Sequence, residues 1–342
     1  MAELKLEQLS KVFGDQTVVR DLNLTIPQGA FTALLGPSGC GKTTTLRILA
    51  GLEELSSGRL LLGDKLLADN MTHTPPELRD MGMVFQSYAL WPHMTVAENV
   101  GYPLKLRKVK GAARQKQVMD ALDIVELGAY ADRSPQELSG GQRQRVALAR
   151  CLVSEPKVVL LDEPLANLDR HLRATMEQTF RDFHRRTGAT FVYVTHDQAE
   201  AMALASHIAV MHKGELMQWG APQDLYLRPQ NAWVASFIGK GSILSLATPA
   251  DVQHLDSQLL HGSFSDGTPY GMQPVLVRPE HVQVTDTGLR ARVEGCIYQG
   301  ERYLVDLRLS DGQQLTAFHH ASLQQQQNVC VRLHQGWRLE TA

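Results

Sequence analysis

The fold is decided by the stretch Gly36-Pro37-Ser38-Gly39-Cys40-Gly41-Lys42-Thr43, which combines a glycine-rich turn, a lysine and a hydroxyl. The apolar segment 31–35 before it has the length of a buried strand, and residues 43–50 after it have the pattern of a helix. Glycines let such a loop turn sharply, so that backbone N–H groups converge on phosphate at a helix N-terminus. The order strand, loop, helix therefore predicts a site for a nucleoside triphosphate.

Within this loop the residue types indicate separate tasks. Lys42 is placed to reach the β- and γ-phosphates, and Thr43 is placed to ligate Mg²⁺. Cys40 would contribute its backbone N–H, while its thiol, beside a helix N-terminus, can have a lowered pKa. The residues predicted to bind ATP here are Gly36, Pro37, Ser38, Gly39, Cys40, Gly41, Lys42, Thr43 and Thr44.

A second motif lies downstream, where the apolar run Val158-Val159-Leu160-Leu161 ends in two carboxylates, Asp162 and Glu163. Such a run is too short for a helix and too uniform for a solvent-facing strand, so it predicts a central parallel strand. Active-site groups of such sheets lie at the carboxyl ends of the strands. We expect Asp162 to hold the Mg²⁺ shell and Glu163 to polarise the water that attacks the γ-phosphate.

A third motif, Leu138-Ser139-Gly140-Gly141-Gln142, precedes a predicted helix over 143–154 that Pro156 closes. Alone, Ser139 could be a plain N-cap. With the two motifs above, the sequence resembles the ATP-binding subunits of ABC transporters. That resemblance implies that Ser139, Gly140, Gly141 and Gln142 contact the γ-phosphate bound by the other subunit of a head-to-tail dimer, again by anion binding at a helix N-terminus.

The resemblance extends to further positions. Gln86, after the predicted strand 83–85, matches a glutamine that touches Mg²⁺ and the attacking water. His196, after the predicted strand 190–195, matches a histidine that hydrogen-bonds the γ-phosphate. Asn167-Leu168-Asp169 matches a loop that crosses the dimer interface, and Phe13 matches an aromatic residue that stacks on adenine, although packing alone would also explain a strand phenylalanine.

Composition agrees with a globular chain of more than one domain. The chain has 342 residues, a formal net charge of −2, 43% hydrophobic and 20% charged residues. No apolar run approaches the roughly 18 residues of a spanning helix, no signal peptide is apparent, and no basic footprint for nucleic acid stands out. Four cysteines without metal-ligand or disulfide spacing suit a reducing cytosol.

The pattern predicts a mixed architecture. We expect an α/β P-loop nucleotide-binding domain over residues 1–235, with a largely parallel sheet and a helical subdomain at about 87–153. Residues 236–342 change to short strands and turns, such as the alternating segment 303–310 followed by Asp311-Gly312, and predict an all-β, OB-like barrel. The segment 275–281 resembles the β-barrel appendage of importer ATPases of the maltose, ferric-iron and polyamine type.

The resemblance implies an ATPase that uses ATP and Mg²⁺ and powers solute import as a homodimer. It implies two permease subunits and an extracytoplasmic binding protein as partners, with the chain peripheral at the cytoplasmic face of the inner membrane. The segment 88–94 resembles the part that meets the permease, and we favour partner contact there over the alternative, a buried aromatic loop. The segment 235–241 leans towards ferric iron, while sugars, sugar phosphates, polyamines and phosphonates stay open.

Two other classes compete with this interpretation. ATPases with this cassette also act on nucleic acid or the ribosome, but this chain has a single phosphate loop, no heptads and no cysteine cluster. A regulator that binds ATP without hydrolysis is disfavoured because Glu163 and His196 are both present. Near-neutral charge and few aromatic residues argue against oligonucleotide binding by the predicted barrel.

Overall fold

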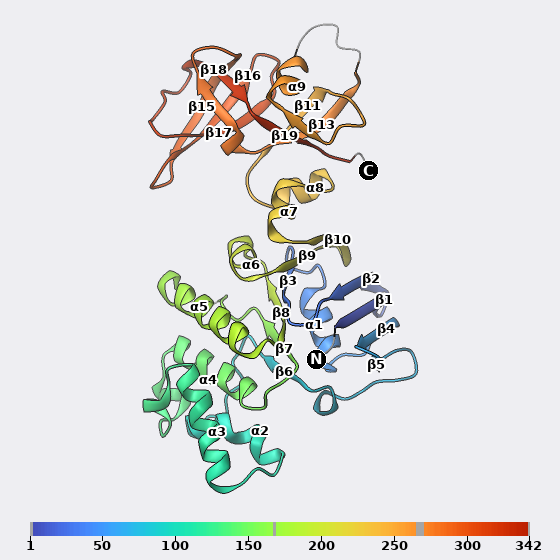
Figure 1. Cartoon of the computed structure of the whole chain (residues 1–342), viewed down its shortest axis with the longest axis vertical. Helices are drawn as coiled ribbons and strands as arrows, with labels where there is room; N and C mark the ends of the chain where they lie inside the picture. The colour runs from blue at the N-terminus through green and yellow to red at the C-terminus, as the bar shows by residue number, and fades with distance from the viewer. Residues whose placement is uncertain (1–2, 167–168, 265–269, 341–342) are drawn as a thin grey trace. The chain divides into compact units, whose positions relative to one another are not determined.

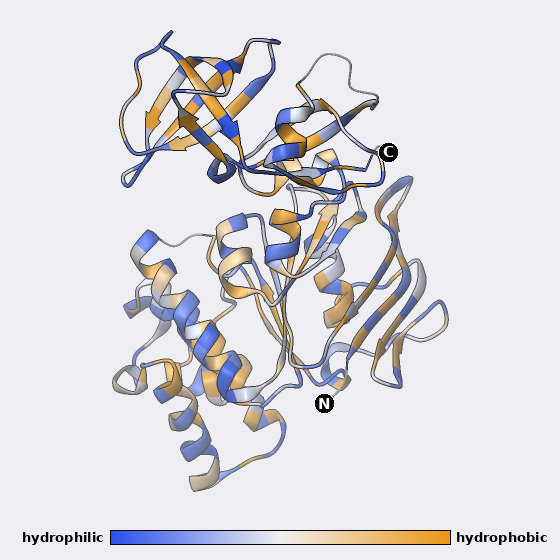
Figure 2. Ribbon diagram, turned by 45° about the horizontal axis from the view of Figure 1, so that its top comes forward, coloured by the Kyte–Doolittle hydropathy of each residue, from blue (hydrophilic) through white to orange (hydrophobic). Residues whose placement is uncertain are grey.

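The computed structural model describes residues 3–166, 169–264 and 270–340, and it divides into two compact units, Met1–Pro222 and Gln223–Ala342 (Figure 1). Each unit has its own hydrophobic core. Figure 2 shows hydrophobic residues concentrated along the strands of each unit. The chain therefore buries its apolar surface in separate cores, as its length requires.

The first unit is built on a six-stranded sheet that is parallel except at one edge. Its strands, in spatial order, are β10 (Glu215–Gly220), β9 (His207–His212), β3 (Phe31–Leu35), β8 (Thr190–Thr195), β7 (Val158–Asp162) and β6 (Met81–Val84). The central strands β3, β7 and β8 are buried along their whole length. Uniformly apolar sequences suit such strands because both faces of the sheet are covered.

A smaller antiparallel sheet and six helices complete the part of this unit that the structure describes. The sheet contains β2 (Gln16–Ile26), β1 (Leu4–Phe13), β4 (Ser57–Leu62) and β5 (Lys65–Ala68). The helices are α1 (Lys42–Ala50), α2 (Val96–Leu106), α3 (Gly111–Ile124), α4 (Gly140–Leu152), α5 (Arg170–Thr187) and α6 (Gln198–Leu204). Helices α2, α3 and α4 pack on one another, as predicted for a helical subdomain. Short 3₁₀ turns lie at Pro76–Leu78, Gly128–Tyr130 and Pro135–Glu137.

The signature helix begins earlier than the sequence pattern predicted. Helix α4 begins at Gly140 rather than at residue 143, and it ends at Leu152. Ser139 caps it: the Ser139 hydroxyl accepts from Gln142 N–H, and the Gln142 side chain accepts from Ser139 N–H. This capping box stabilises a first turn made of glycines, whose intrinsic helix propensity is poor.

The second unit is all-β apart from short helical pieces, which confirms the predicted appendage. One antiparallel sheet contains β11 (Ser242–Ala247), β13 (Met272–Val277), β19 (Gln335–Arg338) and β12 (His254–Asp256). The other contains β14 (Val282–Thr285), β18 (Asn328–Leu333), β15 (Leu289–Tyr298), β16 (Tyr303–Leu309) and β17 (Gln314–His319). Helical segments are α7 (Pro222–Leu227), α8 (Ala232–Phe237), α9 (Ser257–Gly262) and a 3₁₀ turn at Pro279–His281.

The compact units divide at Pro222. The sequence predicted a domain limit at 235/236, where the pattern changes to short strands and turns. The residues between these points belong to the second unit because Arg278 holds them. Its guanidinium donates to Tyr226 O at 2.6 Å and to Ala235 O at 3.5 Å. Its side chain also lies over the Tyr226 ring. Long-range bonds of this kind leave no local signal in the sequence.

Candidate functional site

The glycine-rich loop connects β3 to α1 at the carboxyl end of the strand, as predicted. Two of its glycines have steric reasons to be glycine. A Cβ at Gly36 would lie 2.2 Å from Met211 O, and Gly41, which precedes α1, has φ of 98°. Side chains at either position would therefore displace the loop or strain it.

Lys42 lies inside this loop and is 5% exposed. Its ammonium donates to Gly36 O at 2.7 Å and to Pro37 O at 2.9 Å, and lies 3.7 Å from the Cys40 sulfur. Hydrogen bonds from an ammonium to neutral carbonyl oxygens are weaker than those to charged oxygens. Phosphate oxygens can thus replace the carbonyls at the same cation.

Cys40 corrects the prediction made from its position in the loop. Its side chain is 3% exposed, and burial raises the pKa of its thiol, although Lys42 opposes that rise. Desolvation thus exceeds the expected helix-terminal effect, and the thiol is protonated at neutral pH. Cys40 is a packed side chain, which leaves the backbone N–H as its means of contacting phosphate.

The first two motifs meet through Thr43 and Asp162. The Thr43 hydroxyl donates to Asp162 Oδ1 at 3.2 Å. Asp162 is 9% exposed, and burial raises the pKa of its carboxyl while the Thr43 bond opposes that rise. A hydroxyl and a carboxylate are hard oxygen donors, so this pair fits Mg²⁺ beside a phosphate. The buried carboxylate would also be favoured in its charged form by a nearby cation.

Glu163 adopts an unusual backbone conformation, with φ of 43°. Its N–H donates to Val194 O on β8 at 3.1 Å, which fixes the residue between two strand ends. His196 Nδ1 lies 3.5 Å from Glu163 Oε2, so the structure brings together the two residues predicted to act on the γ-phosphate. Left-handed non-glycine residues cost free energy and cluster at functional sites.

Polar residues that the sequence analysis did not identify are joined by hydrogen bonds and ion pairs close to His196 in the sequence. Glu200 is 4% exposed and accepts hydrogen bonds from the Tyr193 and Thr195 hydroxyls. Arg173 on α5 lies 3.4 Å from Glu200 and 3.1 Å from Asp197. One sequence feature could have pointed to these residues: Asp197, directly after His196, is a residue type that caps helices, and it is the N-cap of α6.

Gln86 and Phe13 are both accessible. Gln86 is exposed and follows the end of β6, which spans 81–84 rather than the predicted 83–85. Phe13 ends β1, is 47% exposed, and has the Lys11 ammonium 4.6 Å from its ring centroid. An exposed ring of this kind can stack on a flat ligand.

The residues of the third motif lie at the N-terminus of α4. A Cβ at Gly141 would lie 2.4 Å from a Leu172 methyl carbon, so Gly141 lets α5 pack closely. Asp169 caps α5 by accepting from Leu172 N–H at 2.9 Å. The other residues of the predicted interface loop, 167 and 168, lie outside the described residues. Gly141 of the signature motif and Asp169 thus both lie beside Leu172.

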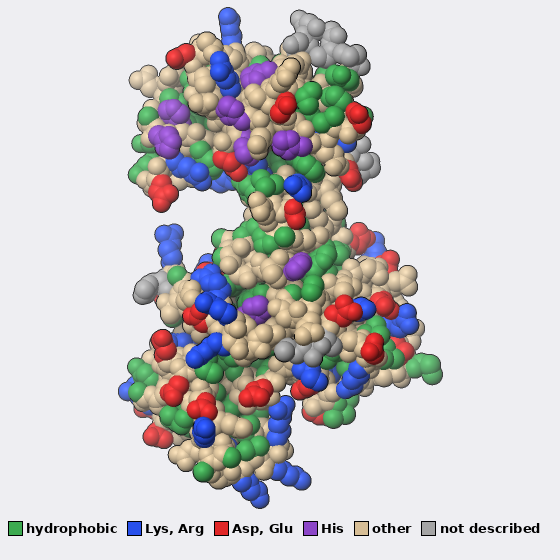
Figure 3. All heavy atoms as spheres, in the orientation of Figure 1, with side chains coloured by type: hydrophobic (Ala, Val, Ile, Leu, Met, Phe, Trp, Pro, Cys, Tyr) green, Lys and Arg blue, Asp and Glu red, His purple; other side chains and the backbone are tan. Residues whose placement is uncertain are grey.

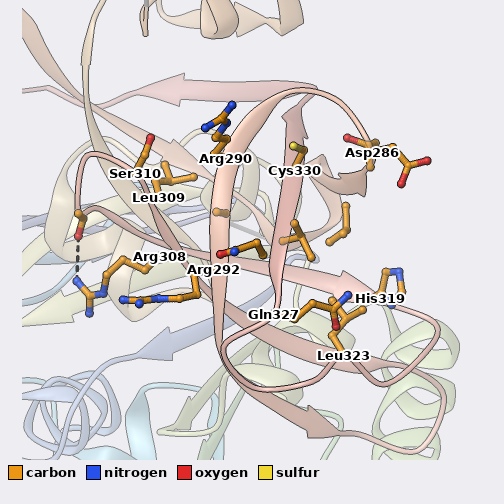
Figure 4. Close-up of a pocket in the computed structure, with 16 residues that line it drawn as sticks. Asp286, Arg290, Arg292, Arg308, Leu309, Ser310, His319, Leu323, Gln327 and Cys330 are labelled. Carbon is orange, nitrogen blue, oxygen red and sulfur yellow. Dashed lines mark hydrogen bonds between the residues drawn. The ribbon is translucent and has the colours of Figure 1, made fainter.

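A cavity of about 1060 Å³ lies in the second unit and is lined by residues within 284–330 of that unit. Figure 4 shows its lining, which includes Arg290, Arg292 and Arg308 on neighbouring strands and none of the predicted site residues. Arg308 is paired with Glu294. In this chain the motifs, rather than cavity volume, identify the candidate site.

Among the helices of residues 3–166, 169–264 and 270–340, none is both long and apolar enough to cross a membrane.

Comparison with family models gives two matches. Residues 19–166 match the model described as ABC transporter, and residues 275–336 match the model described as TOBE domain. The first match contains the phosphate loop, the signature motif, Asp162 and Glu163. The second lies within the all-β unit.

Curated relatives match across most of the chain. The chain is 44% identical to the Fe(3+) ions import ATP-binding protein FbpC of Escherichia coli (strain K12), over 88% of this chain and 86% of the relative. It is 52% identical to the trehalose/maltose import ATP-binding protein MalK of Thermococcus litoralis, over 70% of this chain and 65% of that relative. Coverage therefore extends beyond the nucleotide-binding motifs.

Among solved structures, the chain resembles the ATP-binding cassette MJ0796, described as a dimer in a post-hydrolysis state bound to ADP and Pi. The TM-score is 0.57 at 32% identity, over 64% of this chain and 98% of the other.

Proposed function

The chain belongs to the family of ABC transporter ATP-binding proteins and is an ATPase of that family, and from this premise we propose that it energises import of a small solute as a homodimer. One observation carries the proposal: a strand-end constellation in which Thr43 contacts Asp162 and Glu163 contacts His196. The groups that we propose to bind phosphate, hold the cation and activate water thereby lie together at one edge of the sheet.

The proposed roles follow from these positions. Lys42 exchanges its loop carbonyls for β- and γ-phosphate oxygens. Thr43, Gln86 and Asp162 would hold Mg²⁺, Asp162 through water, and the bound cation would neutralise charge on the phosphates. Glu163 accepts the proton of the attacking water, and His196 donates a hydrogen bond to the γ-phosphate. Phe13 stacks on adenine.

The proposed site is completed by a second copy of the chain. Ser139, Gly140, Gly141 and Gln142 present the N-terminus of α4 to the γ-phosphate of the partner, and Asp169 lies beside them across the interface. The dimeric cassette among the similar structures supports this arrangement. ATP would then hold two copies together, and hydrolysis would release them.

Partners and solute follow from the relatives. We propose two permease subunits and an extracytoplasmic binding protein as partners, with the chain peripheral at the cytoplasmic face of the inner membrane. The printed functions of the relatives are ferric iron import and trehalose/maltose import. Ferric iron is proposed first because several iron relatives match over 86% or more of their own length.

Uptake by a deletion strain tests the solute. Radiolabelled ferric iron and radiolabelled maltose are supplied separately to the deletion strain, to the strain carrying the wild-type gene, and to a strain carrying Lys42→Ala. Loss of iron uptake, restored by the wild type and not by Lys42→Ala, supports the proposal. Loss of maltose uptake instead of iron uptake would make maltose the solute. Unaffected uptake of both would exclude both solutes.

Fractionation tests transport against the competing class of ribosome or nucleic-acid ATPases. On the visible face in Figure 3, acidic and basic side chains are interspersed, as suits a protein without an extended basic patch there. Cross-linked chain should co-purify with membrane proteins. Recovery with ribosomes or nucleic acid, and not with membranes, would contradict the transport proposal.

A further inference from the structure

The loop 85–95 between β6 and α2 is held by two buried polar side chains of the helical subdomain. Asn99 on α2 is fully buried; its amide N donates to Trp91 O, Met94 O and Thr95 O at 3.0–3.2 Å, and its Oδ1 accepts from Trp91 N–H. Arg150 on α4 holds the preceding turn. The loop thus leaves the sheet after Val84 and is hydrogen-bonded to side chains of α2 and α4.

Arg150 makes the contact with the turn. It is 9% exposed, and its guanidinium donates to Tyr88 O at 2.8 Å and to Ala89 O at 2.5 Å. The guanidinium carbon lies 5.0 Å from the Trp91 ring centroid. Within the part of the chain that the structure describes, Arg150 has no ion pair. This buried cation therefore interacts mainly with one loop.

The turn that Arg150 holds is strained. Tyr88 has φ of 62° and Ala89 has φ of 45°, so two consecutive residues with side chains adopt the left-handed conformation. Such residues persist only where surrounding contacts fix them. The two bonds from Arg150 supply that fixation at the carbonyls of these same two residues.

Tyr88 also reaches the signature end of α4. A Cβ at Gly140 would lie 4.0 Å from the Tyr88 hydroxyl oxygen, while the Tyr88 carbonyl is bound to Arg150, near the other end of the helix. Tyr88 is therefore bound to α4 through the Arg150 side chain, while its hydroxyl lies near Gly140 of the signature motif.

We propose that Arg150 is a positioning residue that fixes the Tyr88–Ala89 turn to α4, so that Gln86 and the signature motif shift together when nucleotide binds. The inference rests on the proposed function. Gln86 lies between the end of β6 and the fastened turn, so a change at its side chain is passed to α4 through Tyr88 and Arg150. Conversely, when a nucleotide bound by the partner orders the signature motif, the same contacts transmit this change to Gln86.

Fluorine NMR at Trp91 tests the proposal, because its ring lies against the guanidinium. The full chain carrying Glu163→Gln is labelled with 5-fluorotryptophan at all four tryptophans. The Trp91 signal is identified by its absence in Trp91→Phe. Mg·ATP should shift this signal in the parent. In Arg150→Met the nucleotide-dependent shift should fall by about half or more while ATP affinity stays within about threefold.

Steady-state ATP hydrolysis, measured in the chain that keeps Glu163, supplies the second readout. Arg150→Met should lower kcat by roughly tenfold to a hundredfold with KM within about threefold, because Gln86 is misplaced while nucleotide contacts stay. Arg150→Lys should restore only part of both readouts, since an ammonium cannot bond two carbonyls in the fork geometry of a guanidinium.

Arg145→Met is the matched control. Arg145 lies on the same helix, and its guanidinium donates to Val125 O at 3.2 Å, away from the turn. The Arg145→Met variant should leave the nucleotide-dependent shift of the Trp91 signal and kcat unchanged. A full Trp91 response in Arg150→Met, an equal loss in Arg145→Met, or a parent that binds Mg·ATP without change at Trp91 would each overturn the proposal. A parent that binds no Mg·ATP would contradict the proposed function itself.

Discussion

Replacing Arg79 by methionine is expected to destabilise the first unit. Arg79 is 1% exposed, and burial lowers the pKa of its guanidinium to about 10, so it is charged at neutral pH. The guanidinium donates to Thr74 O at 2.6 Å, to Ile48 O at 2.6 Å and to Leu49 O at 3.0 Å. Two of these carbonyls end α1, the helix that begins at the phosphate loop, so the charge also complements the helix dipole.

The expected magnitude follows from these bonds. Methionine fills much of the space but donates no hydrogen bond. Ile48 O keeps a bond from Gly51 N–H at 3.1 Å, whereas Thr74 O and Leu49 O lose the partner that Arg79 supplies. A buried polar group without its partner costs about 1–3 kcal/mol, so two such carbonyls predict a loss of about 2–6 kcal/mol.

Urea unfolding of the full chain, followed by far-ultraviolet circular dichroism, measures this loss in the transition of the first unit. Arg107→Met is the control: its side chain is 52% exposed, with one bond to Ser154 O at 2.7 Å and a long contact to Asp80. We expect it to lose less than about 1 kcal/mol. Equal stability of the two variants would refute the assignment of a buried structural role to Arg79.

Three further predictions concern the candidate site. Lys42→Ala should weaken ATP binding and turnover together, because the charge acts in ground and transition states alike; unchanged affinity with full activity would contradict this. Ser139→Arg should still bind ATP but fail to dimerise on it, and heterodimers with Lys42→Ala should recover one composite site; folded heterodimers without hydrolysis would count against action in trans. Cys40 should react slowly with a maleimide at neutral pH, and more slowly with Mg·ATP bound, because its thiol is buried with a raised pKa; rapid labelling, or inactivation that persists in Cys40→Ser, would contradict this.

The sequence predicted the central strands and the phosphate loop well because their signals are local. Segments 31–35 and 190–195 are uniformly apolar or β-branched, and both strands coincide with the prediction. The start of α4 was predicted too late, since Gly140 and Gly141 are poor helix formers and only the Ser139–Gln142 capping box overrides that preference.

Other features depend on contacts between residues far apart in sequence. Arg150 lies 61 and 62 positions from the carbonyls that it holds, and Arg79 lies 30 and 31 positions from the end of α1. Neither arginine belongs to a motif. The environment of Cys40 was missed for the same reason, because burial by the folded unit exceeds the effect of its place before α1.

Sedimentation of the Glu163→Gln chain tests the central claim, which is that two copies form composite ATP sites in which Glu163 activates water. The substitution keeps the contacts of Lys42, Thr43 and Asp162 but removes the carboxylate that we propose accepts the proton of water. We predict a monomer without nucleotide, a stable dimer with Mg·ATP, and no measurable hydrolysis. A chain that binds Mg·ATP yet stays monomeric, or that hydrolyses ATP at the wild-type rate, would contradict the account.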